Sequence, residues 1–425
     1  MLTTRPRGTE DILPEEIEAW YYLESTAREV CRQYGYREIR TPIFEHTELF
    51  NRSVGETSDI VSKEMYTFDD RGGRSITLRP EGTAPVVRAF LEHHLYAQVQ
   101  PVKLFYLGPM FRYGRPQAGR LRQFHQFGVE AFGSQDPAID AEVIALAMDF
   151  YRRLGLKNLE LHLNSVGCPA CRSEHRARLQ EFLRDRLSEL CPTCRERFER
   201  NPLRIFDCKE EACREMVARA PTITEALCGN CAAHFQAVQR YLRAIGIEFQ
   251  VDTYLVRGLD YYTHTAFEIM VEGIGAQSSI GGGGRYNGLV EACGGPPTPG
   301  VGFGLGLERI LLALKAQGWE PERRGGADVL VLTAGPGLEE QAFRLTAALR
   351  AAGLAADKDY LGRSLKAQMK YAGRYPVKLA VILGPEEWGR GRALVRDLAE
   401  GWQEEVPLNG LIDYCQKRKG CRDLG

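Results

Sequence analysis

The first apolar pattern along the chain is helical. In residues 14–34, apolar side chains recur at Ile17, Trp20, Leu23 and Ala27, three or four positions apart, as on one face of an amphipathic helix. Residues 34–45 then have the composition of a strand, but this strand contains Pro42. Because a proline cannot donate a backbone hydrogen bond to a neighbouring strand, we expect an edge or interface strand there.

A hairpin and a second helix follow. Residues 65–68 and 75–78 flank the turn sequence DDRGG and should pair as strands. The segment Arg-Pro-Glu-Gly-Thr then leads into a helix predicted over residues 85–95, so that Glu81 lies at the start of a helix.

Residues 104–133 predict two antiparallel strands joined by a basic loop. Side chains alternate between the faces of a strand, so polar residues gather on one face of an otherwise apolar pair. These residues are Tyr106, Gly108 and Arg112 on the first strand and Arg122, Phe124, Gln126, Gly128 and Glu130 on the second. Buried charges must be paired or must meet a ligand. Either an internal salt-bridge network or a binding site satisfies that requirement.

The apolar pattern predicts a helix over 139–154, strands over 159–163, 249–256 and 266–271, and a strand that becomes a helix over 300–314. Between Cys168 and Cys231 the pattern is interrupted by charged helical stretches and by eight of the twelve cysteines. This composition indicates an insertion. Residues 319–326 have the charged, glycine- and proline-containing composition of a linker.

The last hundred residues alternate strand and helix, which predicts a small parallel α/β domain. Its predicted helix near residue 365 carries Arg363, Lys366, Lys370 and Arg374 at helical spacing. A basic face of this kind either is simply solvated or binds a phosphate backbone.

Composition and charge limit the classes of function. A chain of 425 residues is long enough for two or three domains, and its net charge of -1 gives no overall attraction to nucleic acid, so any such contact must come from local patches. No apolar run approaches the length of a membrane span and the N-terminus lacks an apolar signal core. We therefore expect a cytoplasmic protein with no membrane partner.

Three further motifs carry candidate chemistry. The segment VRGLDYYTHTAFE, residues 256–268, places Arg257 beside a glycine, where an unpaired guanidinium would need an anion. The segment GGGGRYNG would let a backbone approach a ligand closely, although a mobile loop is equally consistent with it. In GFGLGLERI, Arg309 follows a glycine-lined strand; a phosphate loop is disfavoured because no Lys-Ser/Thr follows.

Together these stretches resemble the class II aminoacyl-tRNA synthetases, and specifically the histidyl-tRNA synthetase family. The family's order is kept by RPRGTED, TLRPEGT, FRYGRPQAGRLRQFHQ, LVRGLDYY, GGGGRYNG and GFGLGLER. The resemblance implies an α+β catalytic domain on an antiparallel sheet (1–165 and 240–320), an inserted mainly helical domain (166–239) and a C-terminal α/β anticodon-binding domain (327–425). It also implies a homodimer. One departure is Asn287, where the family usually has Asp.

The resemblance also implies an activity: L-histidine and ATP, with Mg²⁺, form histidyl-adenylate, and the histidyl group passes to the 3′ end of histidine tRNA. Catalysis is assigned to Arg112, Arg257 and Arg309. Histidine binding is assigned to Glu81, Thr83, Arg112, Gln126, Glu130, Arg257, Tyr261, Tyr262 and Tyr286. ATP binding is assigned to Arg112, Arg120, Phe124 and Arg309. Contact with tRNA is assigned to Arg115, Gln117, Lys366 and Lys370.

Two rival functions remain. An inactive, histidine-sensing regulatory paralogue would be expected to lack the arginines and the anticodon domain, whereas both are present. A synthetase for another amino acid is disfavoured by the LVRGLDYY block.

The cysteines of the insertion predict structural zinc from their spacing alone. Cys168 and Cys171, separated by nineteen residues from Cys191 and Cys194, match a four-cysteine zinc framework. A second possible quartet comprises Cys208, Cys213, Cys228 and Cys231, and other pairings between the two sets stay open. The alternative is eight independent small apolar residues.

Overall fold

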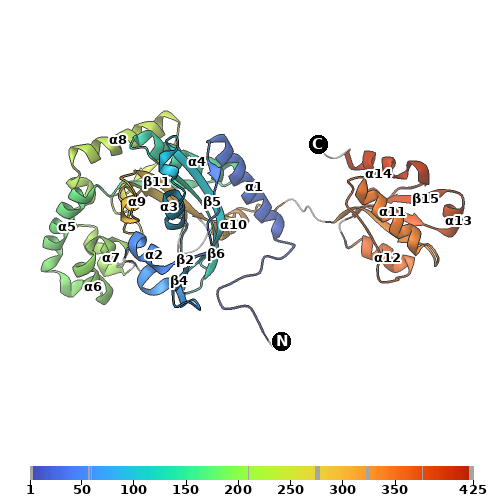
Figure 1. Ribbon diagram of the computed structural model, residues 1–425, viewed down its shortest axis with the longest axis horizontal. Coiled ribbons are helices and arrows are strands. Elements are labelled where there is room, and N and C mark those ends of the chain that lie inside the picture. Colours follow the sequence, from blue (N-terminus) through green and yellow to red (C-terminus); the bar gives the residue numbers. More distant parts are fainter. Residues whose placement is uncertain are drawn as a thin grey trace. The chain divides into compact units, whose positions relative to one another are not determined.

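The computed structural model describes residues 3–55, 58, 60–208, 210–272, 278–321, 326–375 and 377–420. It divides into two compact units, Met1–Pro321 and Glu322–Gly425 (Figure 1). Within the described ranges, no helix is both long and apolar enough to cross a membrane.

The first unit is organised around an eight-stranded sheet in the order β1-β5-β6-β11-β10-β9-β7-β8. The strands are β1 (Arg37–Glu38), β5 (Val102–Phe111), β6 (Gln123–Phe132), β11 (Gly300–Gly306), β10 (Ser279–Arg285), β9 (Thr263–Val271), β7 (Leu159–Ser165) and β8 (Gln250–Val251). All neighbours are antiparallel except the two outermost pairs, β1 with β5 and β7 with β8. The antiparallel sheet predicted for this part of the chain is therefore confirmed.

The two faces of the sheet have different neighbours because side chains alternate along each strand. On β6, Phe127, Val129 and Ala131 belong to the main apolar core. That core includes residues of four helices: α1 (Ile17–Gln33), α4 (Pro137–Arg153), α8 (Gly229–Ala244) and α10 (Leu307–Ala316). The even-numbered residues of β6 face the opposite side, where Phe132 packs with Phe90 of α3 (Thr83–Glu92). The polar residues that alternation places on one face of β5 and β6 lie on this second side.

The pairing of β5 with β6 has the predicted form. Tyr106 lies opposite Gly128 and Gly108 lies opposite Gln126. The glycines have a steric role, since a β-carbon on Gly128 would come 2.3 Å from the hydroxyl of Tyr106. Glycine at this position makes room for the tyrosine ring to lie across the sheet.

The predicted strand over 34–45 is two short strands in different sheets. β1 joins the large sheet, whereas β2 (Phe44–His46) joins a small sheet in the order β2-β4-β3, with β4 (Ser75–Leu78) and β3 (Tyr66–Asp69). Pro42 lies between β1 and β2, where no ladder hydrogen bond is required of it. The helix α2 (Thr47–Val54) follows β2 directly, and α9 (Leu289–Ala292) lies between β10 and β11.

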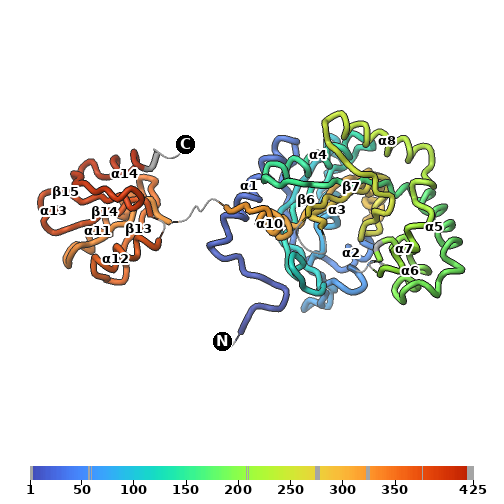
Figure 2. Tube along the Cα trace, turned by 180° about the vertical axis from the view of Figure 1, so that it is seen from behind, coloured from blue at the N-terminus to red at the C-terminus, as the bar shows by residue number. Residues whose placement is uncertain are grey.

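The insertion is mainly helical, as predicted. The helices α5 (Pro169–Arg184), α6 (Pro192–Arg200) and α7 (Glu211–Val217) lie together at one end of the first unit, away from α1 (Figures 1 and 2). They share a small core that includes Leu179, Phe198 and Val217. The last insertion helix, α8, packs its Phe235 and Val238 into the core of the large sheet.

The second unit has a five-stranded sheet in the order β13-β12-β14-β15-β16. Its elements are β12 (Ala327–Thr333), α11 (Glu339–Ala351), β13 (Ala356–Lys358), α12 (Leu365–Ala372), β14 (Val377–Leu383), α13 (Pro385–Gly389), β15 (Arg392–Asp397), β16 (Gln403–Pro407) and α14 (Leu411–Gly420). The predicted parallel arrangement holds for β13, β12 and β14, whereas β15 and β16, which were not predicted, pair antiparallel. The predicted alternation of strand and helix holds from β12 through β14.

Candidate active site

A cavity of about 470 Å³ lies over the polar face of the large sheet. Ten of the residues predicted from sequence line it, although they come from segments more than two hundred residues apart. They are Glu81, Thr83, Arg112, Arg120, Phe124, Gln126, Arg257, Tyr261, Tyr262 and Arg309. The fold thus brings together the predicted histidine-binding and ATP-binding groups.

One end of the cavity rests on a buried network around Glu130. Its carboxylate accepts hydrogen bonds from the hydroxyls of Thr83 (2.7 Å) and Tyr286 (2.5 Å). Glu130 and Tyr286 are almost fully buried beneath the cavity lining, and the ring of Tyr261 meets that of Tyr286 edge to face. Burial raises the pKa of Glu130 to about 8, despite the hydrogen bonds that favour its charged form.

Glu81 is positioned by the start of α3, as the sequence predicts. Its carboxylate accepts hydrogen bonds from the backbone N–H groups of Thr83 and Ala84, both at 2.8 Å. These are among the donors that a helix leaves unsatisfied in its first turn. Burial raises the pKa of the Glu81 carboxyl, with the two backbone hydrogen bonds acting in the opposite direction.

The side chain of Arg257 lies against β10 at Gly282, a position without a side chain. A β-carbon on Gly282 of β10 would come 2.6 Å from Nη1 of Arg257. The guanidinium contacts the carboxylate of Glu268 at 3.4 Å, while its Nε is buried without a hydrogen-bond partner in the described part of the chain. The GGGG segment is therefore part of a strand against which Arg257 lies, and not a loop.

Gln126 has the second unsatisfied atom of this cavity. Its Oε1 is buried and accepts no hydrogen bond from any residue that the structure describes. Buried polar atoms without a partner are rare in folded proteins and point to a missing ligand or water. Gln126 and Arg257 both line the cavity, over β6 and β10 respectively, so a ligand spanning the two would satisfy both.

The other end of the cavity is rich in arginine. Arg112 donates from Nε to the carbonyl of Pro80 (2.7 Å), and its guanidinium lies 5.3 Å from the ring centroid of Phe124. Arg120 pairs with Glu64 at 2.6 Å. Arg309 is in the first turn of α10, as predicted. Burial lowers the pKa of both Arg112 and Arg309, because removal from water disfavours the charged form, and nearby carboxylates act in the opposite direction.

Glu268 of β9 was missed from the sequence: it lines the cavity and accepts a hydrogen bond from Ser279 (2.5 Å). Tyr106, which alternation placed on the polar face without a role, also lines the cavity and fills the space above Gly82 and Gly128. An acidic residue inside the apolar strand THTAFEIMV was the available signal for Glu268.

The four predicted tRNA contacts lie outside this cavity. Arg115 and Gln117 are exposed in the loop between β5 and β6, where Gln117 forms an isolated bridge with Arg120. Lys366 and Lys370 are exposed on α12 of the second unit.

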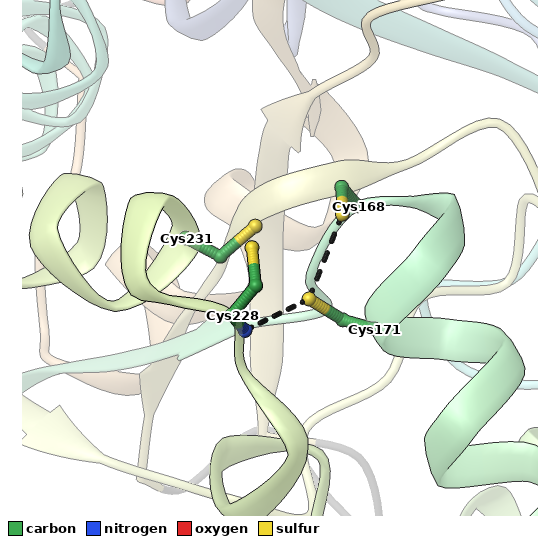
Figure 3. Close-up of side chains that lie close together, drawn as sticks. All are labelled: Cys168, Cys171, Cys228 and Cys231. Atoms are coloured by element: carbon green, nitrogen blue, oxygen red, sulfur yellow. Dashed lines mark hydrogen bonds between the residues drawn. The ribbon is translucent and has the colours of Figure 1, made fainter.

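The insertion cysteines are grouped differently from the prediction. We call Cys168, Cys171, Cys228 and Cys231 the root quartet, and Cys191, Cys194, Cys208 and Cys213 the distal quartet. The grouping of Cys168 and Cys171 with Cys191 and Cys194 was wrong, because the chain folds back and brings the start of α8 to the start of α5 (Figure 3).

Comparisons with known proteins agree with this architecture. Residues 8–310 match the family described as Histidyl-tRNA synthetase, and residues 328–418 match the family described as Anticodon binding domain. A Histidine--tRNA ligase of Moorella thermoacetica is 75% identical over 419 residues, which is 99% of each chain. One from Pelotomaculum thermopropionicum is 64% identical over 98% of each chain.

A solved structure gives the same result for the fold. The apo histidyl-tRNA synthetase of S. aureus superposes with a TM-score of 0.83 at 43% identity, over 97% of this chain and 99% of that chain. The family match covers most of the first unit, the relatives cover nearly the whole chain, and the motifs that carry the resemblance line one cavity. The chain belongs to the histidyl-tRNA synthetases, a family of class II aminoacyl-tRNA synthetases.

Proposed function

We propose that this chain is the ligase that activates L-histidine with ATP and transfers the histidyl group to histidine tRNA. The observation that carries the proposal is the pair of unsatisfied buried atoms in one cavity, Oε1 of Gln126 and Nε of Arg257. One is an acceptor suited to an ammonium or a ring N–H, and the other is a donor suited to a carboxylate or phosphate. The adenylate of an amino acid presents both kinds of group.

Histidine would bind above β6. The acceptor of Gln126 and the carboxylate of Glu81 offer partners for its ammonium and imidazole N–H groups. Thr83, Tyr261 and Tyr262 line this end of the cavity, and Glu130 and Tyr286 support it from beneath. An amino acid without ring nitrogens would leave some of these buried groups unpaired, which is a strong basis for rejection.

ATP would bind at the arginine-rich end. Arg112, Arg120 and Arg309 are placed for its phosphates, and Phe124 offers a ring face for adenine. A histidine carboxylate oxygen then attacks the α-phosphorus, the bond to the bridging oxygen breaks, and pyrophosphate leaves. Arg112, Arg257 and Arg309 lower the barrier by stabilising the developing negative charge. In the second step the terminal ribose hydroxyl of tRNA attacks the carbonyl carbon and AMP leaves.

The donor set of the cavity fits Mg²⁺ carried in with ATP. Mg²⁺ bound to nucleotide phosphates usually takes only one or two carboxylates from the protein, and Glu268 provides one in the cavity lining. The ion would screen charge on the phosphates. No protein base is needed, because the histidine carboxylate is already ionised at neutral pH.

Contact with tRNA is proposed for both units. Arg115 and Gln117 are exposed on the loop beside the cavity and would reach the acceptor end. Lys366 and Lys370 are exposed on α12 and would approach the anticodon stem. Such a ligase would act in the cytoplasm, where tRNA is charged.

We also propose a homodimer that uses the face of the small sheet formed by β2, β3 and β4. Phe44 and Phe68 are 58% and 49% exposed, and register places both on the same face of this sheet. Large exposed apolar side chains at a sheet edge favour association. Phe44→Glu with Phe68→Glu should shift the chain toward monomer in sedimentation velocity, whereas Tyr21→Glu, an equally exposed aromatic on α1, should not. A double variant that sediments as the unaltered protein does would contradict this interface.

The test of the proposed activity is ATP–pyrophosphate exchange with each of the twenty amino acids, followed by charging of histidine tRNA. Exchange should depend on histidine and should be weak with phenylalanine. A protein that binds histidine without exchange would instead be a sensing paralogue, a function disfavoured by the four arginines of the cavity.

A further inference from the structure

The eight cysteines of the insertion form two compact groups that the proposed chemistry does not use. In the root quartet and in the distal quartet, the four sulfur atoms all lie within 4.8 Å of one another. The Sγ atoms of Cys168 and Cys171 are 3.6 Å apart, and those of Cys191 and Cys208 are 3.8 Å apart. Four sulfurs bound to zinc at about 2.3 Å define a tetrahedron with edges of about 3.8 Å, so both distances match such a centre. A disulfide would require about 2.05 Å.

The backbone around the sulfurs has the form of a metal-binding turn. Cys168, Cys191 and Cys228 are the N-cap residues of α5, α6 and α8. Backbone N–H groups donate to sulfur: that of Cys228 to Sγ of Cys171 (3.1 Å) and that of Cys191 to Sγ of Cys213 (3.3 Å). Such donors stabilise thiolates, which are the form that binds metal.

Gly167 allows the first turn to close. Its φ is +64°, and a β-carbon there would come 2.6 Å from Cβ of Cys171. A residue with a side chain would therefore strain the backbone and displace the second cysteine of the pair.

Packing of small apolar residues does not account for the same pattern. Cys228 is exposed, and Cys168, Cys191 and Cys208 are only half-buried. Around the root quartet the apolar cluster contains only two residues that are not cysteine, Ile223 and Leu227. A cluster of that size buries too little surface to hold the ends of a long insertion together.

We propose that the two quartets are two structural zinc sites and that the root site fastens the start of the insertion to its end. Four thiolates complete a tetrahedron, so neither site has an open position for water or substrate. Each zinc ion that binds displaces the protons of its four thiols to solvent. In sequence, all four cysteines of the distal quartet lie between the two pairs of the root quartet. The distal site is therefore nested within the segment whose ends the root site joins.

The root site also supports the wall of the cavity. Arg172, the residue after Cys171, donates from Nη1 to the carbonyls of Asp260 (3.3 Å) and Tyr262 (3.1 Å). Sγ of Cys231 lies 3.6 Å from Nδ1 of His264, and the backbone N–H of His264 donates to the carbonyl of Gly167 at 3.0 Å. Metal at the root site therefore fixes α5 and the segment from Asp260 to His264 in one arrangement.

The experiment is metal analysis of the full-length protein, purified without chelator, incubated with zinc under reducing conditions and desalted. We expect two zinc ions per chain, with zinc surrounded by four sulfurs at about 2.3 Å in X-ray absorption. Cys171→Ser with Cys231→Ser, and separately Cys194→Ser with Cys213→Ser, should each leave one ion. Cys293→Ser, a half-buried cysteine outside both quartets, should leave two.

A zinc content below two in the unaltered protein would overturn the two-site proposal, and two ions retained in either double variant would overturn the assignment of ligands. Cobalt substitution of the unaltered protein keeps the proposal testable if a variant does not fold. The visible bands of a tetrahedral tetrathiolate centre should saturate at two equivalents, and their absence would refute the sites. Loss of root metal should also raise the KM for histidine.

Discussion

Arg257 lies against Gly282 of β10, and its guanidinium is 5.9 Å from the ring centroid of Tyr262. Its Nε has no partner in the described residues, and its only ion pair is the 3.4 Å contact with Glu268. A cation held in this way is ready to stabilise charge at a phosphate that arrives beside it. The energetic consequence should therefore appear in the rate of adenylate formation more than in stability.

Replacing Arg257 by alanine should lower ATP–pyrophosphate exchange by about 10²–10³-fold, in line with the loss of one preorganised charge donor. The matched control is Arg243→Ala, which removes a guanidinium that also lies over an aromatic ring, that of Phe249 at 5.1 Å, but is outside the cavity lining. The control should retain exchange. An Arg257→Ala enzyme with an unaltered exchange rate would remove this residue from the mechanism.

Glu130 gives a prediction about pH. Its pKa is raised by burial from 4.5 to about 8, so between these values the folded chain holds a proton that the unfolded chain has lost. Its contribution to stability is therefore fully present below pH 4.5 and is lost as the pH rises from 4.5 to about 8.

Glu130→Gln should remove this slope. Chemical denaturation without substrate at a series of pH values from 5 to 8 should show the stability of the unaltered protein falling relative to that of the variant. Parallel curves would mean that Glu130 is ionised throughout in the free protein.

Among the elements, those with regular patterning could be predicted from the sequence. The helix predicted in residues 14–34 is α1, and the predicted hairpin is β3 with β4. The polar residues predicted to share one face of β5 and β6 lie on the side of the cavity. The strands β15 and β16 were missed because RALVRD and QEEVP are short, charged segments without the regular alternation of apolar and polar residues that indicates a strand. Glu268 was missed because alternation alone does not say which strands share a cavity.

The cysteines show a second reason why a prediction from sequence can fail. Spacing along the chain correctly gives the pairs, since each pair occupies one turn, but which pairs meet depends on how α5 to α8 pack. That is a property of the tertiary structure. Sequence distance favoured Cys191 as the partner of Cys168, whereas the return of the chain at Cys228 makes the actual contact.

The pair Asp140–Arg285 joins α4 to β10 and is fully buried. Nε of Arg285 donates to both oxygens of Asp140 at 3.1 Å, and His234 of α8 approaches the same carboxylate at 3.3 Å. The hydroxyl of the adjacent Tyr286 donates a hydrogen bond to Glu130, so this pair also supports the end of the cavity that we propose binds histidine.

Asp140→Ala would leave a buried guanidinium without its anion and should destabilise the first unit by about 3–5 kcal/mol. Glu29→Ala removes a pair exposed on α1 and should change stability little. Amide hydrogen exchange in α4 and β10 measures both. Equal protection in the two variants would show that the buried pair is not needed to hold α4 on the sheet.

At the scale of the whole molecule, the two units have separate sheets and separate cores. Adenylate chemistry can be assigned to the first unit alone, since every residue lining its cavity lies before Pro321. The second unit matches the anticodon-binding family, and we propose that it contributes to tRNA binding.

Lys366→Ala with Lys370→Ala should weaken tRNA binding and reduce its salt dependence, because each lost phosphate contact removes roughly one unit of slope. Exchange of pyrophosphate should not change. Arg344→Ala with Lys417→Ala removes the same charge from exposed positions of the same unit on α11 and α14. Identical salt slopes for the two double variants would show that α12 has no special role.

The run of four glycines in β10, residues 281–284, also has a consequence for redesign of the substrate pocket. A β-carbon at position 282, which lines the cavity, would come 2.4 Å from the carbonyl oxygen of Phe267, and one at the adjacent position 283 would come 2.0 Å from that of Gly302. Backbone cannot move aside as a side chain can, so this part of the pocket floor offers no mutational freedom. A library that seeks to accept other amino acids must draw its diversity from β6 and from the tyrosine-bearing segment opposite, where existing side chains can be exchanged.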